Sequence, residues 1–165
     1  MSDKVSIYIP AYNAEKTIEK SIKSIKDQTY SVDEIIIIDD KSSDNTIEIV
    51  NQFKDIILVK NEKNMGLGFT RNLAIKKSSN EIVAAIDADV VLDKHWLEIL
   101  MKNLNKEKVV MCGGKMTEKL VENRINKWRA KYYSQNWGNE NIINPSFLFG
   151  CNCILLKSAW NKING

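Results

Sequence analysis

With 165 residues, of which 44% are hydrophobic, the chain is long enough to bury the core of one compact domain, and its composition argues against disorder and against a coiled coil. Its formal net charge is only +3 and its lysines are spread along the chain, so we expect no nucleic-acid partner. No apolar run approaches the roughly 18 residues of a membrane span, and the start MSDKVS lacks a secretory pattern. We therefore expect a soluble, cytoplasmic protein, with the inner face of the membrane as an alternative location.

Short β-rich runs alternate along the chain with stretches of helical spacing. The predicted strands are residues 5–9, 35–38, 56–59, 82–86 and 109–112. Helices are predicted between them, from Ile18, Ile22 and Ile25, from Ile47, Val50 and Phe53, over residues 69–77, and from Trp96, Leu97, Leu100 and Leu104. Four isoleucines without polar alternation, at 35–38, are typical of a parallel strand that is covered on both faces. This order predicts an α/β fold with a mostly parallel central sheet.

The pattern changes after residue 113. Residues 118–137 are predicted to be an aromatic-rich helix, and residues 147–156 a further strand. The stretch NRINKWRAKYYSQNW mixes basic and aromatic residues at near-helical spacing. We favour packing of Ile125, Trp128 and Tyr132 onto the sheet, and the alternative is a peripheral membrane contact that brings a lipid-linked acceptor close.

The residues that follow the predicted strands are the first candidates for a ligand site, because open α/β sheets bind ligands beyond the carboxyl ends of their strands. These residues are Pro10, Ala11, Tyr12 and Asn13, then Asp39 and Asp40, then residues 61–66, and finally Asp87, Ala88 and Asp89. This edge is acidic. Asp39 is the better candidate for holding the loop, and Asp40 can project into the crevice and accept hydrogen bonds from a base or ribose. Ser42, Ser43, Asp44 and Thr46 are expected to turn the chain and start the next helix.

The motif AIDADVV places Asp87 and Asp89 two residues apart. In an extended chain such side chains point the same way, so both carboxylates can face one pocket. Carboxylates brought together repel one another unless a proton or a cation lies between them. Mg²⁺ or Mn²⁺ fits here, because these ions use one or two protein carboxylates and take their other ligands from water and substrate phosphates. The alternative is that Asp87 and Asp89 merely end a strand. A second acidic pair, Asp39 and Asp40, closes the second strand, and this favours a site for a cation and an anionic diphosphate.

Four segments, VSIYIPAYNAEKTIEKSIKSIKDQTY, IIIIDDKSSDNT, NEKNMGLGFTRNLAI and AIDADVVL, resemble in order and spacing the segments of family 2 glycosyltransferases. The resemblance covers nearly the whole chain and implies the GT-A fold, a Rossmann-like three-layer domain. It implies one domain over residues 1–165, with a nucleotide-sugar-binding half at 1–112 and the start of an acceptor-side half at 113–165. In this family an acidic residue a little beyond the last matching segment is the general base. The sequence ends before reaching it, so the catalytic residue is unknown. We expect a truncated form of a longer transferase, a base at a position that the resemblance does not identify, or a domain that binds the donor without turning it over.

The resemblance also implies roles for particular residues. The nucleoside pocket would be lined by Pro10, Ala11, Tyr12 and Asp40, and Asn64 and Arg71 would lie near the base and diphosphate. Asp87, with Ala88 beside it, would lie against the ribose or sugar, and Asp89 would be the metal-binding carboxylate of the D-x-D motif. In FGCNCILLKSAWNKING, Gly150 and Asn152 would lie near the donor sugar and acceptor site.

The function implied by this resemblance is metal-dependent, inverting transfer of a sugar from a nucleotide diphosphate sugar to an acceptor hydroxyl. A UDP-sugar is the expected donor, and the acceptor is a glycan, a lipid-linked saccharide or a protein. The Mn²⁺ or Mg²⁺ ion would stabilise the departing diphosphate. One alternative is a module that binds the nucleotide sugar without turning it over. Another is a sugar nucleotidyltransferase, although PAYNAEKT lacks the glycine-rich, basic loop of that class.

Overall fold

A computed structural model describes residues 3–104, 108–118, 123–132 and 138–163 of the chain. Its strands are β1 (Val5–Ala11), β2 (Glu34–Asp39), β3 (Ile56–Lys60), β4 (Ile82–Ile86), β5 (Met111–Gly113) and β6 (Asn152–Leu156). Its helices are α1 (Ile18–Lys26), α2 (Thr46–Val50), α3 (Leu67–Lys77), α4 (Trp96–Asn103), α5 (Arg124–Tyr132) and α6 (Lys157–Lys162). The strands and helices predicted up to residue 112 are all present, with ends that differ by a few residues.

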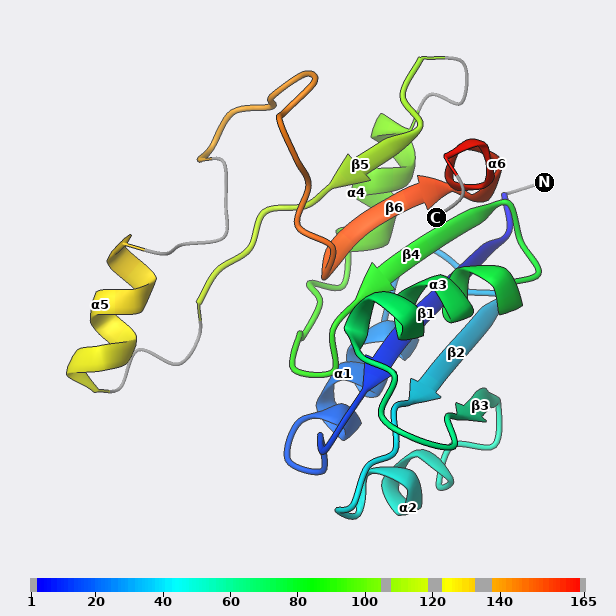
Figure 1. Cartoon of the computed structure of the whole chain (residues 1–165). Coiled ribbons are helices and arrows are strands. Elements are labelled where there is room, and N and C mark those ends of the chain that lie inside the picture. Colours follow the sequence, from blue (N-terminus) through cyan, green and yellow to red (C-terminus); the bar gives the residue numbers. More distant parts are fainter. Residues whose placement is uncertain (1–2, 105–107, 119–122, 133–137, 164–165) are drawn as a thin grey trace.

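The strands form one sheet in the order β3-β2-β1-β4-β6-β5. β1 pairs in parallel with both β2 and β4, and β2 pairs in parallel with β3. β6 is antiparallel to both of its neighbours, β4 and β5. The predicted α/β fold with a mostly parallel central sheet is therefore confirmed. The parallel arrangement brings the carboxyl ends of β1, β2 and β4 to the same edge of the sheet (Figure 1).

Helices cover both faces of the sheet, which gives three layers. Successive side chains of a strand point to opposite faces, so Ile35 and Ile37 pack in one apolar cluster with α1, α2 and α4. Ile36 and Ile38 pack in a second cluster with α3 and with Trp160 of α6. Figure 1 shows α3 in front of the sheet and α1 and α4 behind it. This double coverage explains why the β2 isoleucines show no polar alternation, since burying each such side chain contributes about 1.5–3 kcal/mol.

The strand predicted over residues 147–156 is shorter than expected. The backbone N–H of Asn152 donates to the carbonyl of Phe149 at 3.1 Å and closes a turn, so β6 begins only at Asn152. Helix α6 follows β6 directly and was not predicted from the sequence. This turn places Gly150 against the guanidinium of Arg71 in α3.

The prediction that the aromatic-rich helix packs on the sheet is wrong. The structure describes the middle of the helix predicted over residues 118–137 as α5, and residues 119–122 and 133–137 lie outside the described residues. The side chains of Ile125, Trp128 and Tyr132 are 76%, 54% and 59% exposed. Other helices already cover both faces of the sheet, and α5 projects away from it (Figure 1).

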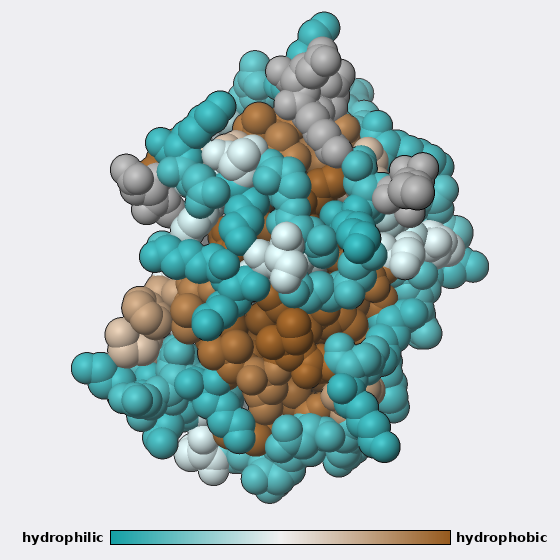
Figure 2. Space-filling model, turned by 90° about the vertical axis from the view of Figure 1, so that its right-hand side faces the viewer, coloured by the Kyte–Doolittle hydropathy of each residue, from teal (hydrophilic) through white to brown (hydrophobic). Residues whose placement is uncertain are grey.

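The outer strand β3 leaves apolar surface uncovered. Ile57 is in register with Ile36 and therefore lies on the α3 side of the sheet. Its side chain is 47% exposed, because α3 packs mainly on β1 and β2 rather than on the outermost strand. Figure 2 shows a continuous apolar patch on the side of the molecule that lies to the right in Figure 1, surrounded by hydrophilic residues.

Candidate functional site

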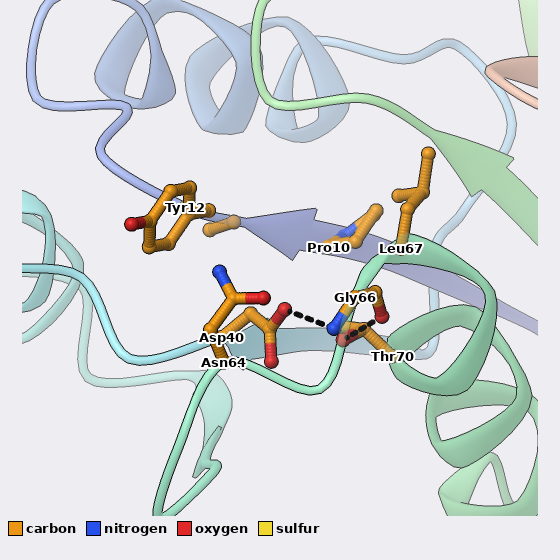
Figure 3. A pocket seen from close by; sticks show the side chains of 8 residues that line it. Pro10, Tyr12, Asp40, Asn64, Gly66, Leu67 and Thr70 are labelled. Atoms are coloured by element: carbon orange, nitrogen blue, oxygen red, sulfur yellow. Dashed lines mark hydrogen bonds between the residues drawn. The ribbon is translucent and has the colours of Figure 1, made fainter.

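A pocket of about 200 Å³ lies where β1 and β2 end and α3 begins. Its lining consists of Pro10, Ala11, Tyr12, Asp40, Asn64, Gly66, Leu67 and Thr70. Figure 3 shows Tyr12 on one side of this pocket and Leu67 on the other. Pro10 and Ala11 belong to β1 itself, which runs two residues further than predicted. The edge of the sheet where the sequence predicts ligand binding thus has a cavity.

The carboxylate of Asp40 fixes the loop that forms one wall of the pocket. Oδ1 accepts hydrogen bonds from the backbone N–H of Met65 at 2.8 Å and from the side-chain amide of Asn61 at 2.7 Å, and Oδ2 accepts the N–H of Gly66 at 2.8 Å. Gly66 has a φ of +85°, which favours glycine. Burial alone would raise the pKa of Asp40, but these hydrogen bonds outweigh it and hold the pKa below its ordinary value. Asp40 is therefore charged, and Oδ2 keeps capacity to accept a hydrogen bond from a ligand.

The polar run after β2 holds the loop that follows β1. The N–H groups of Asn13, Ala14 and Glu15 donate to Ser42 Oγ at 2.9 Å, Thr46 Oγ1 at 2.8 Å and Asp44 Oδ2 at 3.0 Å, respectively. Asp44 also accepts the N–H of Thr46, the first residue of α2, but the N-cap of α2 is Asn45 and not one of the predicted residues 42–44. Asp39 is 1% exposed and accepts the N–H of Ser42 at 3.2 Å, which confirms its predicted role in holding the loop. The loop after β1, which carries Tyr12, and the loop after β2 are thus held together by hydrogen bonds.

Arg71 of α3, next in sequence to the pocket residue Thr70, forms an ion pair with Asp87. Its Nη2 lies 2.7 Å from Oδ1 of Asp87, and the two side chains are only 26% and 31% exposed. Burial alone would lower the pKa of Arg71, but the hydrogen bond and the charge of Asp87 outweigh it and raise the pKa. Arg71 also lies against Gly150, where an added Cβ would be 2.8 Å from Nη1. One guanidinium therefore connects α3, the end of β4 and the turn before β6.

The D-x-D motif forms a turn and does not extend β4. The N–H of Val90 donates to the carbonyl of Asp87 at 3.1 Å, so the alternation expected for an extended chain does not apply to Asp87 and Asp89. Burial raises the pKa of the Cys151 thiol, and the negative charges of Asp87 and Asp89 raise it further. The carbonyl of Ala88 accepts the hydroxyl of Ser21 at 2.9 Å and ties this turn to α1.

The two acidic residues of this turn have different surroundings. Asp87 is engaged by Arg71, whereas Asp89 is exposed. Within the part of the chain that the structure describes, no group of three or more His, Cys, Asp or Glu side chains is arranged to hold a metal ion. A single carboxylate fits an ion such as Mg²⁺, which typically keeps several waters and binds through one or two carboxylates plus substrate phosphates.

Asn152, expected near the donor sugar, has both ends of its amide bonded within the protein. Its Oδ1 accepts the indole N–H of Trp96, and its Nδ2 donates to the carbonyl of Gly114 at 2.9 Å. The side chain is 3% exposed, and an added Cβ at Gly114 would lie only 2.6 Å from Oδ1. Asn152 therefore joins α4, β6 and the segment after β5.

The predicted site residues fall into separate groups in the structure. Five of them, Pro10, Ala11, Tyr12, Asp40 and Asn64, line the pocket. Arg71 and Asp87 form the ion pair, Ala88 and Asp89 lie in the turn after β4, and Asn152 is the buried junction. The sequence reasoning missed the pocket residues Leu67 and Thr70, and it included Gly66 only as part of the candidate segment 61–66. The signal was present, because the glycine at a helix start marks where backbone can approach a ligand closely.

Comparisons with known proteins agree on one family. The sequence model of the family described as "Glycosyl transferase family 2" matches residues 6–163 of this chain. The Escherichia coli protein WfgD, described as a UDP-Glc:alpha-D-GlcNAc-diphosphoundecaprenol beta-1,3-glucosyltransferase, is 40% identical over 112 residues, which are 67% of this chain and 44% of WfgD.

Solved structures share the fold, and TarS and PcManGT are two of them. S. aureus TarS 1–349 in complex with UDP matches with a TM-score of 0.78 and 21% identity over 98% of this chain and 49% of TarS. The mannosyltransferase PcManGT of Pyrobaculum calidifontis, in complex with GDP-Man and Mn²⁺, matches with a TM-score of 0.76 and 22% identity. The match covers 98% of this chain and 46% of PcManGT. The chain thus spans less than half the length of each of these proteins. The GT-A fold is confirmed, and on the family match the chain belongs to glycosyl transferase family 2.

Proposed function

We propose that the chain binds the donor of a metal-dependent, inverting glycosyltransferase of the hexosyltransferase type, which moves a sugar from a nucleotide diphosphate sugar to an acceptor hydroxyl. One observation carries this proposal. The pocket at the carboxyl ends of β1 and β2 is lined by Pro10, Ala11, Tyr12, Asp40 and Asn64, the residues to which the family resemblance assigns the nucleoside and the base. Residues 1–112 would hold the donor, and residues 113–165 would begin the acceptor side.

A UDP-sugar is the proposed donor. The name of WfgD specifies UDP-Glc, and TarS was solved with UDP. We propose that Asp40 Oδ2, which accepts the N–H of Gly66, also accepts the imide N–H of uracil.

Mn²⁺ or Mg²⁺ is the proposed cofactor, with Asp89 as its protein ligand. When bound, the ion would neutralise the charge that develops on the departing diphosphate. Arg71 would keep Asp87 in place through their 2.7 Å contact, so that Asp87 can meet the ribose or sugar while Asp89 meets the cation. Support for the metal comes from the Mn²⁺ in PcManGT and from the exposure of Asp89.

The proposed acceptor carries a hydroxyl on a glycan, a lipid-linked saccharide or a protein. The acceptor in the name of WfgD is a saccharide linked through diphosphate to undecaprenol, which favours the lipid-linked class. Inversion requires a base on the acceptor side, and we assign that role to no described residue.

Thermal unfolding with UDP, UDP-Glc and GDP-Man, each with and without Mn²⁺, tests this function. We expect UDP-Glc with Mn²⁺ to stabilise the chain by about 2.7 kcal/mol at 100 times its dissociation constant. Asp89→Asn should remove the increment due to Mn²⁺ and keep the smaller effect of the nucleoside. Asp27→Asn, an exposed carboxylate distant in sequence from the site, serves as control. A folded protein that no nucleotide stabilises would contradict the proposal.

Gly150→Ala is expected to weaken donor binding about tenfold, which corresponds to a loss of about 1.4 kcal/mol. The added Cβ would lie 2.8 Å from Arg71 Nη1 and 3.3 Å from Cζ, so the guanidinium that pairs with Asp87 must shift. Isothermal titration with UDP-Glc and Mn²⁺ measures the change. Gly68→Ala in α3, where nothing lies within 4 Å of the added Cβ, should leave the affinity unchanged. Equal affinities of the two variants would refute the positioning role of Arg71.

A further inference from the structure

Helix α5 carries an exposed apolar stripe that the donor site does not use. Ile125, Trp128 and Tyr132 follow one another at intervals of three and four residues, which places them on one face of a helix. Their side chains are 76%, 54% and 59% exposed. The rings of Trp128 and Tyr132 pack against each other with centroids 5.7 Å apart, so these two side chains form one aromatic surface.

Positive charge accompanies this stripe. Arg124, Lys127 and Lys131 belong to the same helix, and the segment 123–132 contains no Asp or Glu. Lys131 Nζ lies 5.1 Å from the centroid of the Tyr132 ring, so a cation stands at the edge of the aromatic surface. Figure 1 shows α5 well away from the sheet, where it can meet a large flat object without obstruction by the sheet and its covering helices.

We propose that α5 docks this chain on an anionic lipid surface, with Ile125, Trp128 and Tyr132 at the level of the headgroups. A helix with an aromatic and aliphatic face bordered by Lys and Arg lies in the plane of a membrane interface, with its apolar face in the boundary layer. Charge complementarity selects the occupant, because each Lys or Arg near an anionic leaflet strengthens binding and a stripe without acidic residues meets no repulsion. An apolar protein groove would need the aromatic stripe but not the cations.

This docking would be peripheral. Among the helices in the described ranges, none has both the length and the apolar character that crossing a membrane requires. The inference does not rest on the proposed donor chemistry, since α5 contributes no residue to the pocket. It would place the sugar-binding domain beside acceptors that reside in a membrane.

Sedimentation with lipid vesicles tests the proposal on the chain itself. We expect binding to vesicles of phosphatidylcholine that contain phosphatidylglycerol, weak binding to phosphatidylcholine alone, and loss of binding near 1 M salt, where the screening length falls to about 3 Å. Lys127→Gln with Lys131→Gln should weaken the partition roughly fivefold for each cation removed. Ile125→Ser should weaken it about tenfold, and Trp128→Phe should keep binding while reducing quenching of tryptophan emission by brominated lipid.

Matched variants on other helices control for charge and hydrophobicity. Lys76→Gln with Lys77→Gln removes the same charge from α3, and Ile99→Ser removes an isoleucine of α4 that is 53% exposed. Both should bind vesicles like the unchanged protein, and every variant should keep its nucleotide-induced stabilisation. Absence of binding to anionic vesicles, or equal weakening by the α3 and α5 variants, would overturn the proposal. So would a dimer in gel filtration that the α5 variants dissociate, because a second copy of the chain would then be the occupant.

Discussion

Replacing Asp40 with alanine is expected to lower the free energy of unfolding by about 4 kcal/mol and the melting temperature by about 8–16 °C. The carboxylate is 5% exposed and accepts three hydrogen bonds, and bonds to a charged group each contribute about 1.5 kcal/mol or more. Alanine would leave the N–H groups of Met65 and Gly66 without their acceptor and release a wall of the pocket. Urea unfolding followed by circular dichroism measures the loss, and stabilisation by UDP should disappear with it.

Two further substitutions lie in the loop after β3, which Asp40 holds. They distinguish the loss of this anchor from a general effect of removing a charge. Glu62→Ala removes an exposed carboxylate and should change the free energy of unfolding by no more than about 0.5 kcal/mol. Asn61→Ala removes one of the three donors to Asp40 and should cost about 1 kcal/mol. If Asp40→Ala were as stable as Glu62→Ala, Asp40 would not anchor this loop.

The contribution of Asp40 should also depend on pH. Its pKa in the folded protein lies below the ordinary value of 3.8, so the folded state favours the ionised carboxyl. Its stabilisation is therefore complete above pH 3.8 and is lost as the pH falls through the lower pKa of the folded protein. The difference in unfolding free energy between the unchanged protein and Asp40→Ala should be constant near neutral pH and shrink below pH 3.8. A difference that grew on acidification would contradict this assignment.

Asn152→Leu is expected to lower the free energy of unfolding by about 3 kcal/mol. Leucine has a similar size but cannot accept from the indole N–H of Trp96 or donate to the carbonyl of Gly114. Trp96 is only 8% exposed, so its N–H would lose a partner that water cannot readily replace. Asn103→Leu, at an exposed position of α4, is the matched control and should change stability little.

A double-mutant cycle with Trp96→Phe makes this test more specific. Removing both polar partners leaves no unpaired indole N–H, so the double variant should be less destabilised than the sum of the single changes. The destabilisation that remains in the double variant measures the lost hydrogen bond to the carbonyl of Gly114 and the change in side-chain shape. If Asn152→Leu kept full stability and lost only sugar binding, Asn152 would be a donor ligand and not the buried junction that its hydrogen bonds indicate.

Local apolar spacing predicted most of the fold. The isoleucine run of β2 and the three-residue spacing in the helices reflect burial within one element, which neighbouring positions in the sequence encode directly. The same information located Pro10, Ala11, Tyr12, Asp40 and Asn64 near the cavity, because parallel strands bring their carboxyl ends to one edge. The predictions weakened after residue 113, where short apolar runs do not distinguish a strand from a turn and a surface helix from a buried one.

The contacts of the site depended on partners distant in sequence. Asp40 is held by Met65 and Gly66, 25 and 26 positions later, and Arg71 pairs with Asp87, 16 positions later. Nothing in the short segments around these residues specifies such pairs. They arise because the loops after β2, β3 and β4 converge at one edge of the sheet, and the turn at Val90 re-orients Asp87 and Asp89 after the strand has ended.

The sequence by itself determined the order of strands and helices up to residue 112, the parallel core of the sheet and the acidic edge at which a ligand would bind. Only the tertiary structure decided that β6 lies between β4 and β5, that Asn152 is a buried junction, and that the apolar face of α5 is exposed. The physical reason is that periodicity records which side chains of an element avoid water, whereas the choice of neighbour depends on which surfaces remain uncovered once all the elements have packed.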